Sequence, residues 1–209
     1  MKALSNEGAF NLFLFLFFMV IKNFLKKNNL ELVEQIAKGW TSFVYLVKDS
    51  KGNFFIAKSL REKANRRDMV ERESENLALA NSIGVGPKLI ETDFENNVVL
   101  LEFIEGRIFM EWLFFTPKKN ELEKFLKELF DQAKKLDKKG LDHGQLAGKG
   151  KNIIVRKGKP VIIDFEKASA KRKAGNVNQL KSFLFVNPHS AIPKKVKEIL
   201  GPDFDKFLS

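Results

Sequence analysis

The sequence predicts an α+β protein built from two parts, a small antiparallel sheet with one helix and then a mostly helical second half. Between residues 31 and 104, five short stretches rich in β-branched and aromatic residues are separated by turn residues, and one long helical pattern follows the third. Beyond residue 116 the apolar spacing changes to that of a helix. The 209 residues are 44% hydrophobic and 30% charged, which is a globular composition. We therefore expect a hydrophobic N-terminal segment at 1–30, a first part at 31–106 and a second part at 107–209.

In the first part, three strands are expected in ELVEQIAKG, SFVYLVKD and FFIAKSL, and SKGN supplies a turn between the second and the third. These three form an antiparallel meander. A helix is then expected from about Asn65 to Ser82, because Val70, Glu73, Leu77 and Ala80 share one stripe at helical spacing. GVGP ends this helix, and the segments PKLIETDF and NNVVLLEFI supply two more strands.

The second part begins with a long helix. Thr116-Pro117 predicts its start, with threonine as the N-cap and proline in the first turn, and Gly140 ends it. Its apolar stripe consists of Leu122, Phe125, Leu126, Leu129, Phe130, Ala133 and Leu136. A short hairpin of NIIV, RKGK and PVIID follows, and a further helix is expected near Pro193 to Leu200.

The hairpin brings two polar residues together. The start of its first strand lies beside the end of its second strand, so we expect Asn152 and Asp164 to be neighbours. An amide oxygen next to a carboxylate is a ligand pair that could bridge magnesium to phosphates.

Composition restricts the chemistry of the chain. It has no cysteine and only two histidines, His143 and His189, which excludes disulfides and thiolate metal sites and disfavours a zinc site. Catalysis must then use carboxylates, amides, lysines and the backbone. Abundant Lys, Glu, Ile and Phe fits a cytoplasmic protein of a heat-adapted organism.

The net charge of +11 is concentrated in the second half. Residues 1–106 hold 14 Lys or Arg against 14 Asp or Glu, whereas residues 107–209 hold 23 against 12. The simpler interpretation is a soluble surface of lysine-rich helices. The alternative is an anionic partner such as RNA, a ribosomal particle or an acidic protein.

The N-terminus carries a run of apolar residues, AFNLFLFLFFMVI, from Ala9 to Ile21. Thirteen residues are too few for a membrane span, which needs about 20, and the flanks do not fit a signal peptide. We expect Met19 to be the true start, which would make this run an upstream artefact. The next choice is an interfacial anchor, and membrane contact is expected only if residues 9–25 are genuine.

Five motifs follow one another along the chain: AKGWTSFV, FIAK, LLEFIEG, LDHGQLAGKGKN and IIDFE. In this order they resemble the protein-kinase-like superfamily, and more narrowly the atypical archaeal serine/threonine kinases related to the RIO and lipopolysaccharide-kinase-like groups. The resemblance covers roughly residues 31–185. It implies a bilobal protein-kinase-like fold with a five-stranded antiparallel N-lobe, one inserted helix and a minimal, mostly helical C-lobe. Only 43 residues follow Glu166, so a regulated activation loop is not expected.

The resemblance assigns nucleotide-binding roles in the first part. AKGWTSFV is similar to the glycine-rich loop, with Ala37, Gly39 and Ser42 at the glycine positions and Val44 covering the adenine. FIAK is similar to the VAIK strand, which makes Lys58 the residue that contacts the α- and β-phosphates.

The helix after this strand should offer Lys58 a glutamate. Glu73 fits because it shares a face with Leu77, and Glu75 is the alternative. LLEFIEG resembles the linker between lobes, where the Glu102 carbonyl would accept from the adenine amino group and the Ile104 amide would donate to the ring.

The resemblance assigns metal and acceptor roles in the second part. IIDFE is similar to the DFG motif, with Asp164 as a magnesium ligand and Glu166 in place of glycine, and Asn152 is the second ligand. LDHGQL is similar to HGDL, with Gln145 at the position of the catalytic aspartate. Glutamine cannot act as a base but can orient a nucleophile, and Asp142 is the alternative acceptor-orienting residue.

Three further expectations concern this part of the chain. His143 should support the loop backbone, and Lys149 and Lys151 could contact the γ-phosphate or an anionic substrate. The basic run KASAKRKAG after Glu166 is expected to be a solvated loop, with nucleic-acid contact as the alternative.

The expected function is ATP- and Mg²⁺-dependent phosphoryl transfer to serine or threonine of a protein substrate. Two other functions stay open. The chain could be a nucleotide-binding pseudokinase or ATPase-type switch that serves as an assembly factor, or it could phosphorylate a small molecule.

Overall fold

The computed structural model describes residues 20–207 apart from 40, 61–68, 116 and 149. Contacts group the described chain into two compact units, the first reaching to Ser74 and including Leu89–Phe103, the second made of Glu75–Lys88 and the chain from Ile104 onward. The boundaries expected at residues 30 and 106 stay predictions.

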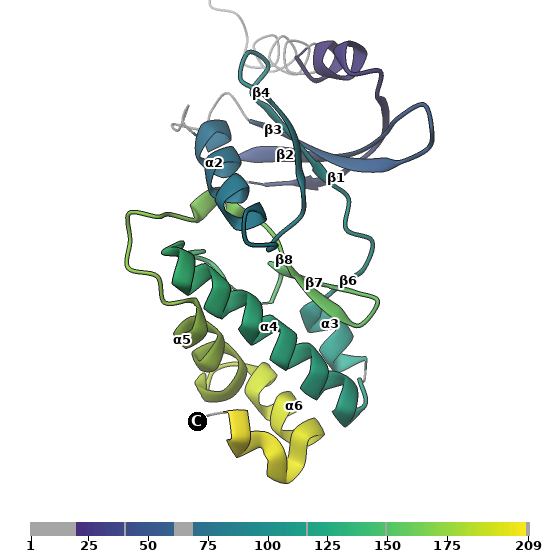
Figure 1. Ribbon diagram of the computed structural model, residues 1–209. Coiled ribbons are helices and arrows are strands. Elements are labelled where there is room, and N and C mark those ends of the chain that lie inside the picture. The colour runs from purple at the N-terminus through teal and green to yellow at the C-terminus, as the bar shows by residue number, and fades with distance from the viewer. Residues whose placement is uncertain (1–19, 40, 61–68, 116, 149, 208–209) are drawn as a thin grey trace, which may run out of the picture. The chain divides into compact units, whose positions relative to one another are not determined.

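The first unit is built on a five-stranded antiparallel sheet (Figure 1). Its strands are β1 (Glu31–Lys38), β2 (Ser42–Lys48), β3 (Phe54–Leu60), β4 (Leu89–Asp93) and β5 (Val98–Glu102). They lie in the order β1-β2-β3-β5-β4, so the predicted meander of the first three strands is confirmed and β3 is central.

One face of this sheet is covered by a helical stretch at residues 20–27. Its apolar side chains Ile21, Phe24 and Leu25 are at most 7% exposed. They pack against the core residues Phe43, Tyr45, Val47, Ala57, Val98 and Leu100. These three side chains therefore belong to the hydrophobic core of the first unit. The rest of the apolar N-terminal run, residues 9–19, lies outside the described residues.

No helix among the described residues is long and apolar enough to cross a membrane.

The inserted helix is α2 (Met69–Asn81). Residues 65–68, which the sequence places at its start, lie outside the described part. The predicted stripe is confirmed, because Val70, Glu73, Leu77 and Ala80 are each at most 5% exposed. Beyond Asn81 the chain turns through Gly84 and Gly86, both with positive φ.

The second unit is organised around α4 (Lys119–Lys139), whose buried residues are the seven of the predicted stripe. Gly140 ends the helix in the left-handed conformation (φ 74°), as predicted. The predicted start was wrong. The N-cap is Lys118, whose backbone N–H is bound by the Glu121 carboxylate at 2.8 Å, and Thr116 lies outside the described residues.

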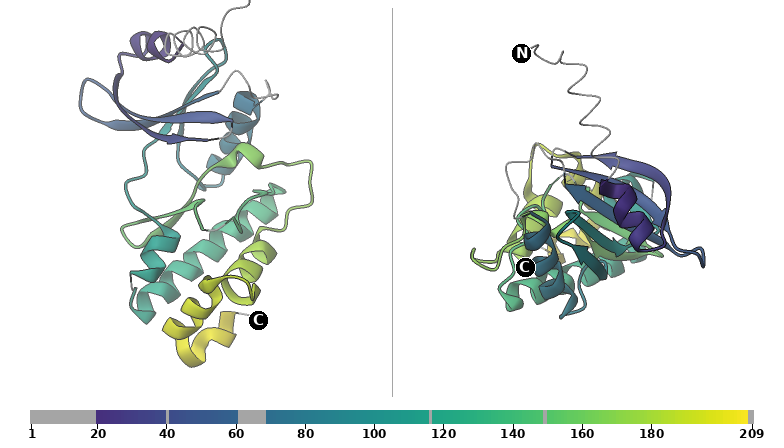
Figure 2. Two further views of the ribbon diagram at one scale, coloured as in Figure 1. Left: turned by 180° about the vertical axis from the view of Figure 1, so that it is seen from behind. Right: turned by 90° about the horizontal axis from the view of Figure 1, so that it is seen from above.

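A three-stranded sheet and short helices complete this unit. The strands β6 (Arg107–Ile108), β7 (Ile153–Arg156) and β8 (Lys159–Ile162) lie in that order, so the predicted hairpin is confirmed as β7–β8. The remaining helices are α3 (Phe109–Phe114), α5 (Asn176–Lys181) and α6 (Ala191–Leu200), with shorter turns at η1 (Phe165–Lys167), η2 (Ser182–Val186) and η3 (Gly201–Phe207). Figure 2 shows α5 and α6 alongside α4. The sequence predicted α6 but missed β6, α3 and α5, which are too short to show a period.

Candidate active site

The turn between β1 and β2 is closed by a hydrogen bond from the Gly39 amide to the Ser42 carbonyl, at 2.8 Å. A Cβ on Gly39 would lie 3.2 Å from that carbonyl oxygen, so the turn favours glycine because of its close approach. Ala37 pairs in register with Val44 across the two strands. The four residues assigned to the nucleotide loop thus lie together, and Trp40 between them lies outside the described residues.

Lys58 and Glu73 form an ion pair inside the first unit. The Lys58 Nζ lies 2.5 Å from Glu73 Oε1, and the side chains are only 14% and 6% exposed. The central strand β3 holds Lys58 between Val44 on β2 and Val99 on β5. Helix α2 presents Glu73 on its buried stripe, whereas Glu75 is exposed. Of the two glutamates that the sequence left open, Glu73 is the one that contacts the lysine.

The chain leaves β5 through the segment that the sequence assigns to adenine. Leu101 and Ile104 are buried, at 5% and 6% exposure, and Glu102 is half-buried at the end of the strand. The groups assigned to adenine are the Glu102 carbonyl and the Ile104 amide. Because both are backbone groups, the assignment does not depend on the side chains of this segment.

Asn152 and Asp164 flank the β7–β8 hairpin as predicted. Ile153 pairs with Ile162, and one residue further the Ile163 amide donates to the Asn152 carbonyl at 2.9 Å. The Asn152 side-chain nitrogen donates to the Gln145 carbonyl at 3.1 Å, which directs the amide oxygen, a hard ligand, away from that contact. Asp164 has left-handed backbone torsions (φ 69°, ψ 70°). Such a conformation costs roughly 1–2 kcal/mol in a non-glycine residue, and strain of this kind is concentrated at functional sites.

Backbone hydrogen bonds and one buried side chain hold the described residues of the loop 141–152 together. The Gln145 carbonyl accepts from the Gly148 amide at 2.9 Å, and the Lys151 amide donates to the Gly148 carbonyl at 3.3 Å. Leu146 is fully buried and anchors the loop, while the Gln145 side chain is half-buried. Lys151 is exposed, and Lys149 lies outside the described residues.

Asp142 is tied to other side chains of the second unit. Its two carboxylate oxygens accept from Arg172 Nε and from Gln179 Nε2, both at 2.8 Å, and the residue is 7% exposed. This arrangement occupies the carboxylate that the sequence offered as an alternative acceptor-orienting group. The sequence missed both partners, and the only signal for Arg172 was the basic run KASAKRKAG.

His143 supports the loop, as expected. The residue is fully buried, its Nε2 lies 2.9 Å from the Ile163 carbonyl oxygen, and its ring meets the Phe165 ring edge-on at 4.9 Å between centroids. Phe165 also lies against Gly86, where a Cβ would come within 2.9 Å of the Phe165 ring. The aromatic residue after Asp164 is thereby locked in the core of the second unit.

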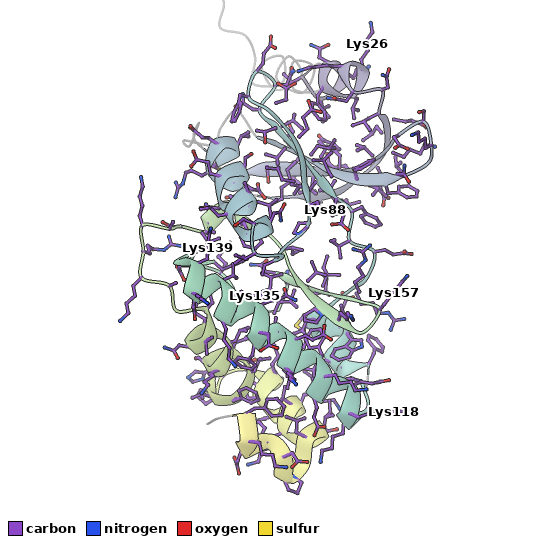
Figure 3. All side chains as sticks on the ribbon, in the orientation of Figure 1. Lys26, Lys88, Lys118, Lys135, Lys139 and Lys157 are labelled. Atoms are coloured by element: carbon purple, nitrogen blue, oxygen red, sulfur yellow. The ribbon has the colours of Figure 1, made fainter. Side chains whose placement is uncertain are left out.

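The surplus positive charge of the second half lies on exposed side chains. Lys118 and the α4 residues Lys135 and Lys139 are exposed, as is Lys157 in the β7–β8 turn (Figure 3).

A family model of the RIO domain matches residues 37–181. In sequence, the chain is 36% identical over 101 residues to the KEOPS complex subunit Bud32 of Pyrococcus abyssi (strain GE5 / Orsay). That alignment covers 48% of this chain and 44% of the relative, so it spans less than half of the relative's length.

In structure, the chain is similar to the autoinhibited serine kinase domain of the giant muscle protein titin, with a TM-score of 0.65 over 88% of this chain and 71% of that one. Sequence identity to it is 17%, so this likeness concerns the fold. The α+β bilobal kinase-like fold predicted from the sequence is confirmed, as is membership of the atypical part of the protein-kinase-like superfamily.

Proposed function

Because the chain belongs to the RIO domain family, we propose that it is an ATP- and magnesium-dependent phosphotransferase that acts on serine or threonine of a protein. The observation that carries this proposal is the buried ion pair between Lys58 and Glu73. A pair of this kind fixes the ammonium of a lysine on a central strand, which is the arrangement that protein kinases use to hold the α- and β-phosphates.

The burial of Glu73 explains why the pair is specific. A buried carboxylate without a partner is costly, so Glu73 requires a cation next to it. Lys58 fulfils this need and is held in one place by it. Its ammonium has three donors, and the proposal assigns this ammonium to the α- and β-phosphates of ATP.

Asn152 and Asp164 fit a magnesium site by their chemistry. Both present oxygen ligands, which magnesium prefers, and a magnesium ion commonly takes one or two protein carboxylates together with phosphate oxygens. When bound, the ion would neutralise charge on the β- and γ-phosphates. The chain's contribution is to hold the Asn152 amide and the Asp164 carboxylate at neighbouring positions of one hairpin.

Gln145 is the residue that we assign to the acceptor. In the proposed reaction, the acceptor hydroxyl oxygen bonds to the γ-phosphorus, the bond from the γ-phosphorus to the bridging oxygen of the β-phosphate breaks, ADP leaves, and the hydroxyl proton is released to water. Catalysis of this transfer rests mainly on positioning and charge neutralisation, so a hydrogen bond from Gln145 can orient the hydroxyl without removing its proton. Asp142 is assigned no acceptor role because Arg172 and Gln179 occupy its carboxylate.

A second candidate function is a nucleotide-dependent switch within a protein assembly. The absence of an aspartate at position 145 favours it, and so does the relative that is a KEOPS complex subunit. In this function ATP is bound and hydrolysed without a phosphorylated acceptor. The third candidate, transfer to a small molecule, keeps the same nucleotide site with a different acceptor.

The test is incubation of the full chain with γ-labelled ATP and magnesium, followed by measurement of labelled protein and free phosphate together. We expect the wild type to label protein, Asp164→Ala to lose this labelling, and Asp205→Ala, an exposed acid of the same unit, to keep it. Phosphate release without labelled protein would favour the switch, and labelling of added sugars or other small molecules in preference to protein would favour the third candidate. Equal labelling by the wild type and Asp164→Ala would refute the metal assignment.

A further inference from the structure

The basic run KASAKRKAG after Glu166 is not only a solvated loop, because its Arg172 forms an ion pair with Asp142 of the second unit. Arg172 donates through Nε to the Asp142 carboxylate at 2.8 Å and through a terminal nitrogen to the Lys167 carbonyl at 2.6 Å. Lysine has a single terminal nitrogen and cannot reproduce this two-pronged contact. Arg172 therefore contacts Asp142 in the loop 141–152 and Lys167 in its own segment, 167–179, and so joins the two stretches.

The ion pair lies beside a backbone connection. Asp142 and Ser169 exchange two backbone hydrogen bonds, of 3.0 and 2.8 Å, as an isolated antiparallel bridge. Gln179, at the end of the same segment, binds the second carboxylate oxygen of Asp142. Asp142 is thus held from three directions, and all of these contacts come from residues 169–179.

Gly144 makes the close approach of the arginine possible. Its φ is +77°, and a Cβ at this position would lie 2.5 Å from an Arg172 terminal nitrogen and 2.7 Å from the Lys167 carbonyl oxygen. Any other residue at 144 would be strained and would push the arginine away. The contact between Arg172 and Asp142 therefore requires glycine at position 144.

Asn176 makes a second connection between the same two stretches. It is fully buried, accepts from the His143 amide at 2.9 Å and donates to the Leu141 carbonyl at 2.8 Å. Asp137, at the end of α4, accepts from the backbone of Asn176 and Val177 and so caps α5. The backbone on both sides of Asp142 is fixed by this network.

From these contacts we infer that Arg172 is a positioning residue, which acts through Asp142 to hold the loop 141–152 in the arrangement that presents Gln145 and Asn152. This inference rests on the proposed function for its catalytic consequence. The Arg172 guanidinium and the Asp142 carboxylate are both side chains of the unmodified chain. The loop can therefore be held in place without phosphorylation of the segment 167–179.

The test compares Arg172→Gln with Lys171→Gln in the full chain. Lys171 is the exposed neighbour of Arg172 and carries the same charge, so it is a matched control. Two measurements are made on each variant: amide hydrogen exchange of residues 141–152, which does not depend on activity, and the steady-state kinetics of phosphoryl transfer.

We expect Arg172→Gln to speed exchange in the loop by roughly tenfold, the fold-change that corresponds to losing one charge-assisted hydrogen bond. We expect kcat to fall by a similar factor while KM for ATP, which we assign to Lys58, changes by less than about twofold. Lys171→Gln should match the wild type in both measurements.

Asp142→Asn removes the ion pair from the other side, and the double variant with Arg172→Gln should be no worse than the more impaired single variant, because both changes break the same contact.

Wild-type exchange and kinetics in Arg172→Gln would overturn the inference, and so would additive effects of the two changes. If the wild type transfers no phosphate at all, the proposed function fails, while the exchange measurement still decides whether Arg172 holds the loop.

Discussion

At the scale of single residues, the Lys58–Glu73 ion pair joins the central strand β3 to the buried stripe of α2. The sequence favoured Glu73, which shares a helical face with Leu77, but left Glu75 open, and only the contact with Lys58 decides between them. The contacts of Asp142 could not be foreseen, since its partners lie 30 and 37 residues away in a stretch without periodic pattern. Local periodicity predicts which face a residue occupies, but not which distant loop meets it.

Removing Lys58 tests the pair directly. In Lys58→Ala the Glu73 carboxylate stays buried without this cation, and breaking a buried pair in this way costs about 3 kcal/mol of unfolding free energy. We expect this loss in urea unfolding, together with loss of ATP binding in calorimetry. Glu75→Gln, on the exposed face of the same helix, should change neither quantity. Intact ATP affinity and turnover in Lys58→Ala would contradict the role assigned to this lysine.

Asp93 is a second residue whose environment predicts a measurable effect. Burial alone would raise its pKa, but hydrogen bonds from the backbone and side chain of Asn96 and from Lys27 outweigh burial and hold the pKa at about 2. Because this lies below the value of about 3.9 in an unfolded chain, the unfolded state binds more protons in acid. The contribution to stability is full above about pH 5 and is lost as the pH falls toward 2.

We therefore expect Asp93→Asn to lower the unfolding free energy by about 2 kcal/mol at pH 7. The difference from the wild type should shrink steadily between pH 5 and pH 2 in urea titrations. Lys27→Met, which removes one of the partners, should show a smaller change with the same pH trend. A difference that stayed constant down to pH 2 would show that the loss comes from packing and not from ionisation.

At the scale of elements, strongly periodic segments were predicted and short ones were missed. The five strands of the first unit and the stripe of α4 follow from alternation and helical spacing. The start of α4 was misplaced because Thr116-Pro117 resembles a helix start, whereas the Lys118 backbone and Glu121 form the cap. The elements β6, α3 and α5 have two to six residues, and tertiary packing, not local pattern, fixes them.

The β7–β8 turn gives a prediction at this scale. The turn sets the register of the hairpin, and this register brings Asn152 next to Ile163, the residue before Asp164. Arg156 pairs with Lys159, so the loop has two residues, and both have positive φ: Lys157 at 50° and Gly158 at 78°. Such turns favour Asn-Gly. Lys157→Asn should stabilise the chain by a few tenths of a kcal/mol and Gly158→Ala should destabilise it by about 1 kcal/mol in urea unfolding. Equal stability of the two variants would argue against this turn geometry.

At the scale of the whole molecule, the order of motifs along the chain carried more information than any one of them. Only Gly39 of the three loop glycines is present, and Gln145 and Glu166 replace residues typical of kinases. The family was nevertheless identifiable from the order of the motifs, and each motif falls on the expected element: a strand for Lys58, a helix for Glu73, and a hairpin flanked by Asn152 and Asp164. The acceptor could not be identified, since acceptor specificity depends on loop shape.

The proposed function gives Lys58 a role in binding ATP and Asp164 a role in binding magnesium, and thermal unfolding can distinguish these two roles. A ligand at 100 times its Kd stabilises the folded state by about 2.7 kcal/mol. We expect ATP with magnesium to raise the melting temperature of the wild type, and ATP with EDTA to raise it less. Lys58→Ala should lose the shift under both conditions, because Lys58 is assigned to the phosphates directly. Asp164→Ala should keep the smaller shift seen with EDTA and lose only the gain from magnesium. If Asp164→Ala also abolished the shift in EDTA, Asp164 would be acting on the fold or on ATP itself and not as a metal ligand.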